Sequence, residues 1–256
     1  MSTTMTPEIN PPQPSQPALG EMERITNMFH APTMTFEDLK RNSSWFIPIL
    51  LYIVLSITFV KIIDVKIGWP QVVDNILANL PEKQKDRLAQ ATPEQQAQQR
   101  DAMIKGYKYG SYIIGPVFIL ILYTVLAGIY MASMNFGMGA ELRYKQCLAV
   151  VSYAGIPSIL RSCLAMAMPF IIKDPSTFNM QNPVVTNLGF LVSQASHPAL
   201  YTLASFMDVF AIWSMVLSGI GLACISGKKT STAMMVVVGW FVAFVALFTG
   251  LALLRS

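Results

Sequence analysis

The chain has 256 residues, of which 53% are hydrophobic and 12% charged, against about a quarter charged in an ordinary soluble domain. Its 18 Lys and Arg residues outnumber its 14 Asp and Glu residues, which gives a formal net charge of +4. This composition argues against a soluble protein with buried helices, and a membrane topology accounts for the basic excess without a nucleic-acid partner.

Residues 1–28 are expected to form a disordered tail, because prolines among Ser, Thr and Gln cannot build a core. No basic start followed by an apolar run is present, so we expect no cleavable signal peptide, and the first span then acts as its own insertion signal. Between Glu21 and Lys40 apolar residues return. They indicate short helices near the bilayer surface or, alternatively, a plain linker.

Five apolar runs are each long enough to cross a hydrocarbon core, which takes about 20 residues. They cover residues 45–63, 111–134, 146–172, 201–225 and 233–254. The sequence therefore predicts an all-α, polytopic integral membrane protein with five transmembrane helices. Cys147, Cys163 and Cys224 all fall inside these runs, so they are interpreted as small side chains at helix contacts rather than a disulfide framework.

The extramembrane loop, residues 64–108, shows internal order. Its first half has apolar residues at the spacing of an amphipathic helix, namely Trp69, Val72, Val73, Ile76, Leu77 and Leu80. Thr92-Pro93-Glu94-Gln95 is typical of a capping box with proline at the first helical position. We favour a spacer with its apolar face against the bundle, and an external docking element is the alternative.

The basic residues near the spans predict an orientation. They precede the first span and lie between spans two and three and between spans four and five, at Arg24, Lys40, Arg41, Arg143, Lys145, Lys228 and Lys229. Basic residues favour the cytoplasmic side, so the N-terminus is expected in the cytoplasm and the C-terminus outside. The loop 64–108 contains seven basic residues mixed with acids and argues the other way by count.

Two ionisable residues lie within the predicted spans, Arg161 in the third and Asp208 in the fourth. Both share a helix face with small residues, which is typical of helix contacts. At about 1.5 Å per residue they lie roughly 16 Å and 10 Å from the non-cytoplasmic helix ends, an offset that an arginine can bridge. We expect an intramembrane Arg161–Asp208 pair. It is interpreted first as a clamp between the two spans and alternatively as part of a substrate or proton pathway.

The sequence predicts no enzyme. No histidine lies in any span to act as a base, and no paired carboxylates, His-Glu-x-x-His motif or phosphate-binding glycine loop is present. His30 and His197 lie far from the cysteines, so no metal spacing exists. We therefore expect no catalytic residue and no cofactor or metal site.

Several motifs, in their order along the chain, resemble the Yip (Ypt-interacting protein) membrane domain in its bacterial form. They are Pro32-Thr33-Met34-Thr35-Phe36, Tyr153-Ala154-Gly155-Ile156-Pro157, His197-Pro198-Ala199-Leu200-Tyr201 and Asp208-Val209-Phe210-Ala211-Ile212-Trp213. The resemblance places a Yip-type membrane domain at residues 29–255 and implies five helices with a cytoplasmic N-terminus. Eukaryotic relatives bind Rab-type GTPases, but their Asp-Leu-Tyr-Gly-Pro-type signature is absent here, so GTPase binding is not carried over.

These observations predict a multi-pass protein of a bacterial inner membrane. Its expected role is that of a non-enzymatic membrane scaffold or a protein-organising, trafficking-type factor. The alternative is a small transporter or channel that uses Arg161 and Asp208. The expected partners are the lipid bilayer and proteins bound through the cytoplasmic N-terminal tail or helix faces, with a homo-oligomer left open.

Overall fold

The computed structural model describes residues 18–255, and this part of the chain consists of helices and loops without a β-strand. Four helices are long and apolar enough to cross a membrane, α3 (Phe46–Lys66), α6 (Pro93–Ala132), α10 (Val209–Ser226) and α11 (Thr230–Arg255). A fifth span forms if α7 (Tyr144–Ala154) and α8 (Pro157–Ile171), which meet at a bend of 42°, are counted together. The predicted all-α, polytopic membrane fold is confirmed.

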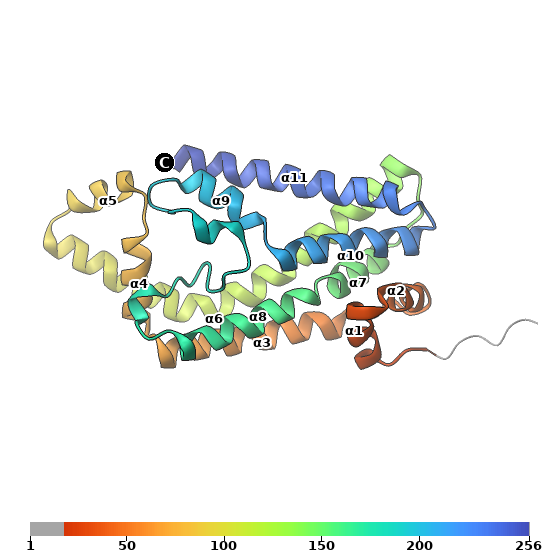
Figure 1. The fold of residues 1–256 in the computed structure, drawn as a ribbon, viewed down its shortest axis with the longest axis horizontal. Coiled ribbons are helices and arrows are strands. Elements are labelled where there is room, and N and C mark those ends of the chain that lie inside the picture. The colour runs from red at the N-terminus through yellow and green to blue at the C-terminus, as the bar shows by residue number, and fades with distance from the viewer. Residues whose placement is uncertain (1–17, 256) are drawn as a thin grey trace, which may run out of the picture.

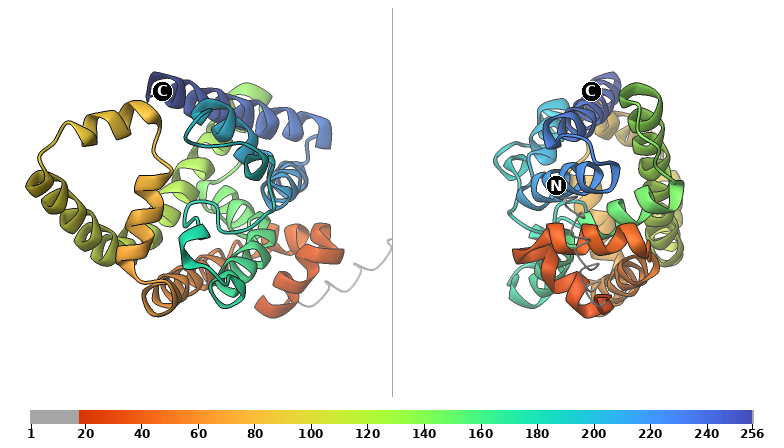
Figure 2. Two further views of the ribbon diagram at one scale, coloured as in Figure 1. Left: turned by 60° about the vertical axis from the view of Figure 1, so that its left-hand side comes forward. Right: turned by 90° about the vertical axis from the view of Figure 1, so that its right-hand side faces the viewer.

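The spanning helices run side by side along the long axis of the molecule (Figure 1). At one end lie the short helices α1 (Glu21–His30) and α2 (Pro32–Arg41), which we call the α1–α2 hairpin. At the other end lie α4 (Trp69–Ala78) and α5 (Glu82–Ala89), as the left view of Figure 2 also shows. The end with α1 and α2 is called the hairpin end, and the end with α4 and α5 is called the loop end.

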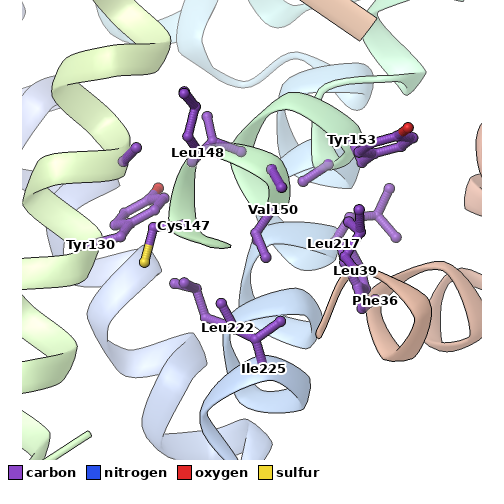
Figure 3. Packing of buried hydrophobic residues seen from close by; sticks show 14 of the residues in the cluster. Phe36, Leu39, Tyr130, Cys147, Leu148, Val150, Tyr153, Leu217, Leu222 and Ile225 are labelled. Atoms are coloured by element: carbon purple, nitrogen blue, oxygen red, sulfur yellow. The ribbon is translucent and has the colours of Figure 1, made fainter. Parts of the chain in front are cut away.

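Helix α7 lies at the centre of the bundle near the hairpin end. Its residues 147–154 are all buried, as expected of a helix that is surrounded by others. It contacts α6, α10, α3 and both helices of the hairpin. In Figure 3 its side chain Val150 is directed toward Leu222 of α10 and Phe36 of α2, and all three belong to one buried cluster. The hairpin is therefore part of the core.

A glycine on α10 makes room for the hairpin. A Cβ atom built on Gly221 would lie 2.7 Å from side-chain atoms of both Phe36 and Val150. Real Cβ atoms do not approach other atoms so closely, so no larger residue fits here without movement of its neighbours. Gly221 allows Phe36 to enter between α7 and α10.

Gly221→Ala is expected to lower the free energy of unfolding by about 1–3 kcal/mol, the usual cost of overpacking a core. Gly239→Ala on α11 is the matched control, because no atom lies within 4 Å of its built Cβ. Both changes gain the same helix propensity, so their difference isolates the steric effect. Denaturant unfolding in detergent micelles measures both, and equal values for the two variants would contradict the packing account.

The loop end is ordered by α4 and the start of α6. The apolar face of α4, with Trp69, Val72 and Ile76, is buried against Val60 and Ile63 of α3, as the amphipathic pattern predicts. The predicted capping box is confirmed at Thr92 and Gln95, whose side chains bond each other's backbone N–H. Helix α6 thus begins well before the predicted span and, with 40 residues, is about 60 Å long, twice the thickness of a hydrocarbon core.

An ion pair joins α6 to α4 at this end. Arg100 donates to both carboxylate oxygens of Asp74, at 2.7 and 2.9 Å. The hydrogen bonds from Arg100 lower the pKa of Asp74 below its ordinary value. Both side chains are largely exposed, so the pair fixes geometry more than it adds stability.

Two predicted boundaries differ from the structure. Residues 21–28 were assigned to the disordered tail but lie in α1, where the side chains of Arg24 and Met28 are buried, and the short helices expected between Glu21 and Lys40 are α1 and α2. Residues 1–17 lie outside the described residues. The fourth span was expected over residues 201–225, whereas a separate helix α9 (Pro198–Phe206) ends before Asp208 and α10 begins after it. Both differences arise from polar contacts between segments distant in the sequence.

Candidate functional site at two helix breaks

Asp208 is the N-cap of α10 and does not lie inside a helix. Its Oδ1 accepts hydrogen bonds from the backbone N–H groups of Phe210 and Ala211, at 2.9 and 3.1 Å. A carboxylate is favoured there because it satisfies free N–H groups and the positive end of the helix dipole. The face that the sequence assigned to Asp208 by helical projection is therefore wrong, since the helix is interrupted at this residue.

The loop between α8 and α9 folds back to this break. Asp208 pairs with Asn187 in an isolated antiparallel bridge, and Val209 N–H donates to the Thr186 carbonyl at 3.1 Å. The Thr186 hydroxyl also donates to Asp208 Oδ2. The buried amides of Asn182 and Asn187 bond each other at 2.7 and 3.2 Å. The loop thus supplies partners to the backbone and side-chain groups that the break leaves free.

Glycine at position 189 allows this loop to pack closely against α9. A Cβ atom on Gly189 would lie 2.1 Å from Ser205 Oγ and 2.9 Å from Asn187 Oδ1. Residues 175–207 contain no Asp, Glu, Lys or Arg, and the loop exposes apolar side chains such as Leu188 and Leu191. The segment has the composition of a chain that enters the apolar zone and lies against protein there.

The structure brings Arg161 of α8 and Asp208 together. Arg161 Nε lies 3.3 Å from Asp208 Oδ2, and the side chains are 33% and 8% exposed. Asp208 therefore accepts four hydrogen bonds, two from backbone N–H groups and two from the side chains of Thr186 and Arg161. Four bonds use the acceptor capacity of a carboxylate. Among residues 18–255, the structure gives Arg161 an acceptor only at Nε.

The break lies well within the apolar length of the bundle. Phe206 packs against Phe241 and Phe248 of α11, with ring centroids 6.3 and 6.0 Å apart. The break is therefore level with about the middle of this α11 segment. That point is roughly ten residues, or about 15 Å, before the end of α11 at the loop end.

A second helix break adjoins the first. Helices α7 and α8 meet at Gly155, whose carbonyl accepts a hydrogen bond from the Tyr52 hydroxyl. Three residues further on, Ser158 Oγ lies 3.4 Å from Ser214 Oγ of α10. Two interrupted helices therefore lie against each other, with hydroxyl groups at one break and the Arg161–Asp208 pair beside the other.

A separate charged cluster fixes the α1–α2 hairpin, and the sequence did not point to it. Arg24 is bonded to Asp38 through Nη2 at 2.6 Å and Nε at 2.8 Å, and the two side chains are 1% and 2% exposed. Arg24 also bonds Glu21 at 3.0 Å, and Glu21 accepts from the Tyr153 hydroxyl of α7. Arg41 bonds the other oxygen of Asp38 at 2.8 Å.

The electrostatics of the hairpin follow from these bonds. Burial alone would raise the pKa of Asp38, but hydrogen bonds from Arg24, the Leu19 backbone and Arg41 together lower it. Burial likewise opposes the charge on Arg24, and its bonds to Asp38 and Tyr153 raise its pKa in spite of this. Both groups are thus held in their charged forms.

Within residues 18–255, no group of three His, Cys, Asp or Glu side chains is placed to hold a metal ion. The cysteines Cys147, Cys163 and Cys224 are free. Two buried or half-buried charged clusters of the described residues are the pair at the helix breaks and the cluster in the hairpin.

Comparison with known protein families gives one finding. A family model described as the Yip1 domain matches residues 26–251, nearly the whole chain. No curated protein and no solved structure matches the chain. The matched region includes both helix breaks and most of the α1–α2 hairpin.

Proposed function

The chain belongs to the Yip1 domain family, and from this premise we propose that it is a non-enzymatic membrane scaffold, a protein-organising or trafficking-type factor. The observation that carries the proposal is the α1–α2 hairpin. The buried Arg24–Asp38 pair joins its two helices, and Phe36 and the bond from the Tyr153 hydroxyl to Glu21 attach it to the bundle. The hairpin also exposes apolar and charged side chains, namely Met22 and Glu23 on α1 and Met34, Glu37 and Lys40 on α2.

A surface of this kind suits a protein partner. Methionine is enriched in protein interfaces, and charged groups around an apolar centre form their usual rim. Because the hairpin is already ordered, a partner does not have to supply the entropy of ordering it. A homo-oligomer formed through helix faces is a compatible further assembly.

Substitution of the hairpin surface tests the proposal. We expect a stoichiometric partner to co-purify with the chain from its native membrane, and its recovery to fall at least about tenfold in the double variant Met22→Glu, Met34→Glu. A tenfold loss corresponds to about 1.4 kcal/mol of binding free energy. Gln98→Glu, exposed near the loop end, is the control and should retain the partner. Equal recovery from both variants would contradict a role for the hairpin.

We place the chain in a bacterial inner membrane with the N-terminus in the cytoplasm and the C-terminus outside. The basic residues of the short connections, such as Arg143, Lys145, Lys228 and Lys229, follow or precede helix ends at the hairpin end, and this supports the orientation. An impermeant thiol reagent applied to whole cells should then label Gln90→Cys but not Lys229→Cys. The opposite pattern would reverse the topology.

A second candidate is a small transporter or channel that uses Arg161 and Asp208. The adjacent breaks at Gly155 and Asp208 favour it, because transporters build midplane sites from interrupted helices. Ion or solute flux in reconstituted vesicles that disappears with Asp208→Asn would support this function. Flux that survives the substitution would exclude the pair from the pathway.

A further inference from the structure

Arg161 has more hydrogen-bond donors than the described protein satisfies. A guanidinium carries five N–H groups, and only Nε–H has an acceptor among residues 18–255, at the rather long distance of 3.3 Å. The four Nη–H groups lie on a side chain that is one-third exposed. A charged group at this depth needs acceptors, because the hydrocarbon supplies none.

The surroundings of Arg161 indicate where the acceptor comes from. Leu160 and Leu164 on the same helix are exposed, 41% and 48%, so this side of α8 faces lipid. Asp208 carries the counter-charge of Arg161, and the positive end of α10 is opposed by the negative end of α9, which stops at Phe206 beside it. The cluster is therefore close to neutral, and what it lacks is hydrogen-bond acceptors for the Nη–H groups of Arg161.

We propose that the Nη edge of Arg161 binds the phosphate of a phospholipid from the leaflet at the loop end. Guanidinium and phosphate match in geometry, since two parallel N–H groups bond two phosphate oxygens. The long arginine side chain extends along its helix toward the headgroup region, and a phosphate drawn down between α8 and α10 meets it. The proposal goes beyond the scaffold role and does not depend on it.

Lipid retention tests the proposal in the full chain. The purified protein is placed in mixed micelles with equal amounts of phosphatidylglycerol and phosphatidylcholine, and native mass spectrometry counts the lipid that stays bound. We expect preferential retention of phosphatidylglycerol, a loss of about tenfold or more in Arg161→Gln, and a gain in Asp208→Asn, because that change removes the neighbouring negative charge. If the Arg161–Asp208 pair only held the helices together and bound no lipid, the two substitutions would not change lipid retention in opposite directions.

Three controls keep the result decisive. Lys61→Gln removes an exposed charge from α3 and should change retention less than about twofold. Arg161→Lys keeps the charge beside Asp208 and should bind at an intermediate level, which covers the case in which Arg161→Gln fails to fold. Inorganic phosphate should not replace the lipid. Equal retention by the wild type, Arg161→Lys and Asp208→Asn, or binding of inorganic phosphate alone, would overturn the proposal.

Discussion

Replacing Asp38 with alanine is expected to loosen the α1–α2 hairpin and to lower the free energy of unfolding by about 3–5 kcal/mol. This is the usual cost of removing one partner from a buried ion pair, because the remaining charge is left uncompensated. Here that charge is Arg24, which is 1% exposed and bonded to Asp38 at 2.6 Å. Hydrogen–deuterium exchange of residues 21–41, together with denaturant unfolding in micelles, measures the effect.

Two further variants separate the pair from a general loss of charge. Glu37→Ala removes a neighbouring but exposed acid, paired with Lys40, and should cost only about 0–1 kcal/mol. Arg24→Met combined with Asp38→Leu replaces both charges by apolar groups and should recover much of the loss, as in other buried pairs. An effect of Asp38→Ala no larger than that of Glu37→Ala would contradict the burial of the pair.

The same pair predicts a dependence on pH. The pKa of Asp38 is lowered in the folded protein from its ordinary value of 3.8. Its contribution to stability is therefore fully present well above that value and is lost as the pH falls through 3.8 toward the folded-state pKa. Exchange in the hairpin, corrected for the intrinsic exchange rate at each pH, should rise in this acid range, and Asp38→Ala should remove that part of the rise.

The helices of the bundle were predictable because apolar runs report burial in lipid or protein directly. The run 45–63 coincides with α3 to within a few residues at each end, and the run 233–254 lies within α11. The amphipathic spacing from Trp69 and the cap at Thr92 are likewise local patterns, and local patterns survive folding when no distant contact opposes them. The family resemblance was carried by short motifs within and between these segments and is confirmed by the family match.

The hairpin cluster and the helix break at Asp208 depend on distant contacts and could not be predicted in the same way, although the sequence led us to expect Arg161 beside Asp208. In the sequence Arg24 resembles a surface charge that sets the topology. In the structure it is buried against Asp38 of the next helix, and its neighbour Glu21 accepts a hydrogen bond from Tyr153 of α7. Asp208 lies in an apolar run, so hydropathy alone predicts a continuous helix through this position. The break exists because Thr186, 22 residues earlier, returns to pair with it. The one local signal was that aspartate favours N-caps over helix interiors.

Asp208→Ala is expected to lower the free energy of unfolding by about 2–4 kcal/mol. The change removes two capping hydrogen bonds, which cost about 0.5–2 kcal/mol to lose, and leaves Arg161 and Thr186 without their acceptor. Denaturant unfolding measures the loss. Asp208→Asn is the matched control, because asparagine caps helices about as well as aspartate, and should cost less than Asp208→Ala.

The sign of the Asp208→Ala effect distinguishes the two structures considered for the fourth span. Inside a continuous apolar helix, alanine would stabilise, because it is the better helix former and removes a charge from the bilayer. At an N-cap it destabilises. The double variant Arg161→Gln, Asp208→Asn, compared with the two single variants, measures the coupling between the residues. Residues in one ion pair are expected to deviate from additivity by about 0.5–3 kcal/mol. Stabilisation by alanine would refute the cap, and full additivity of the pair would refute the clamp between α8 and α10.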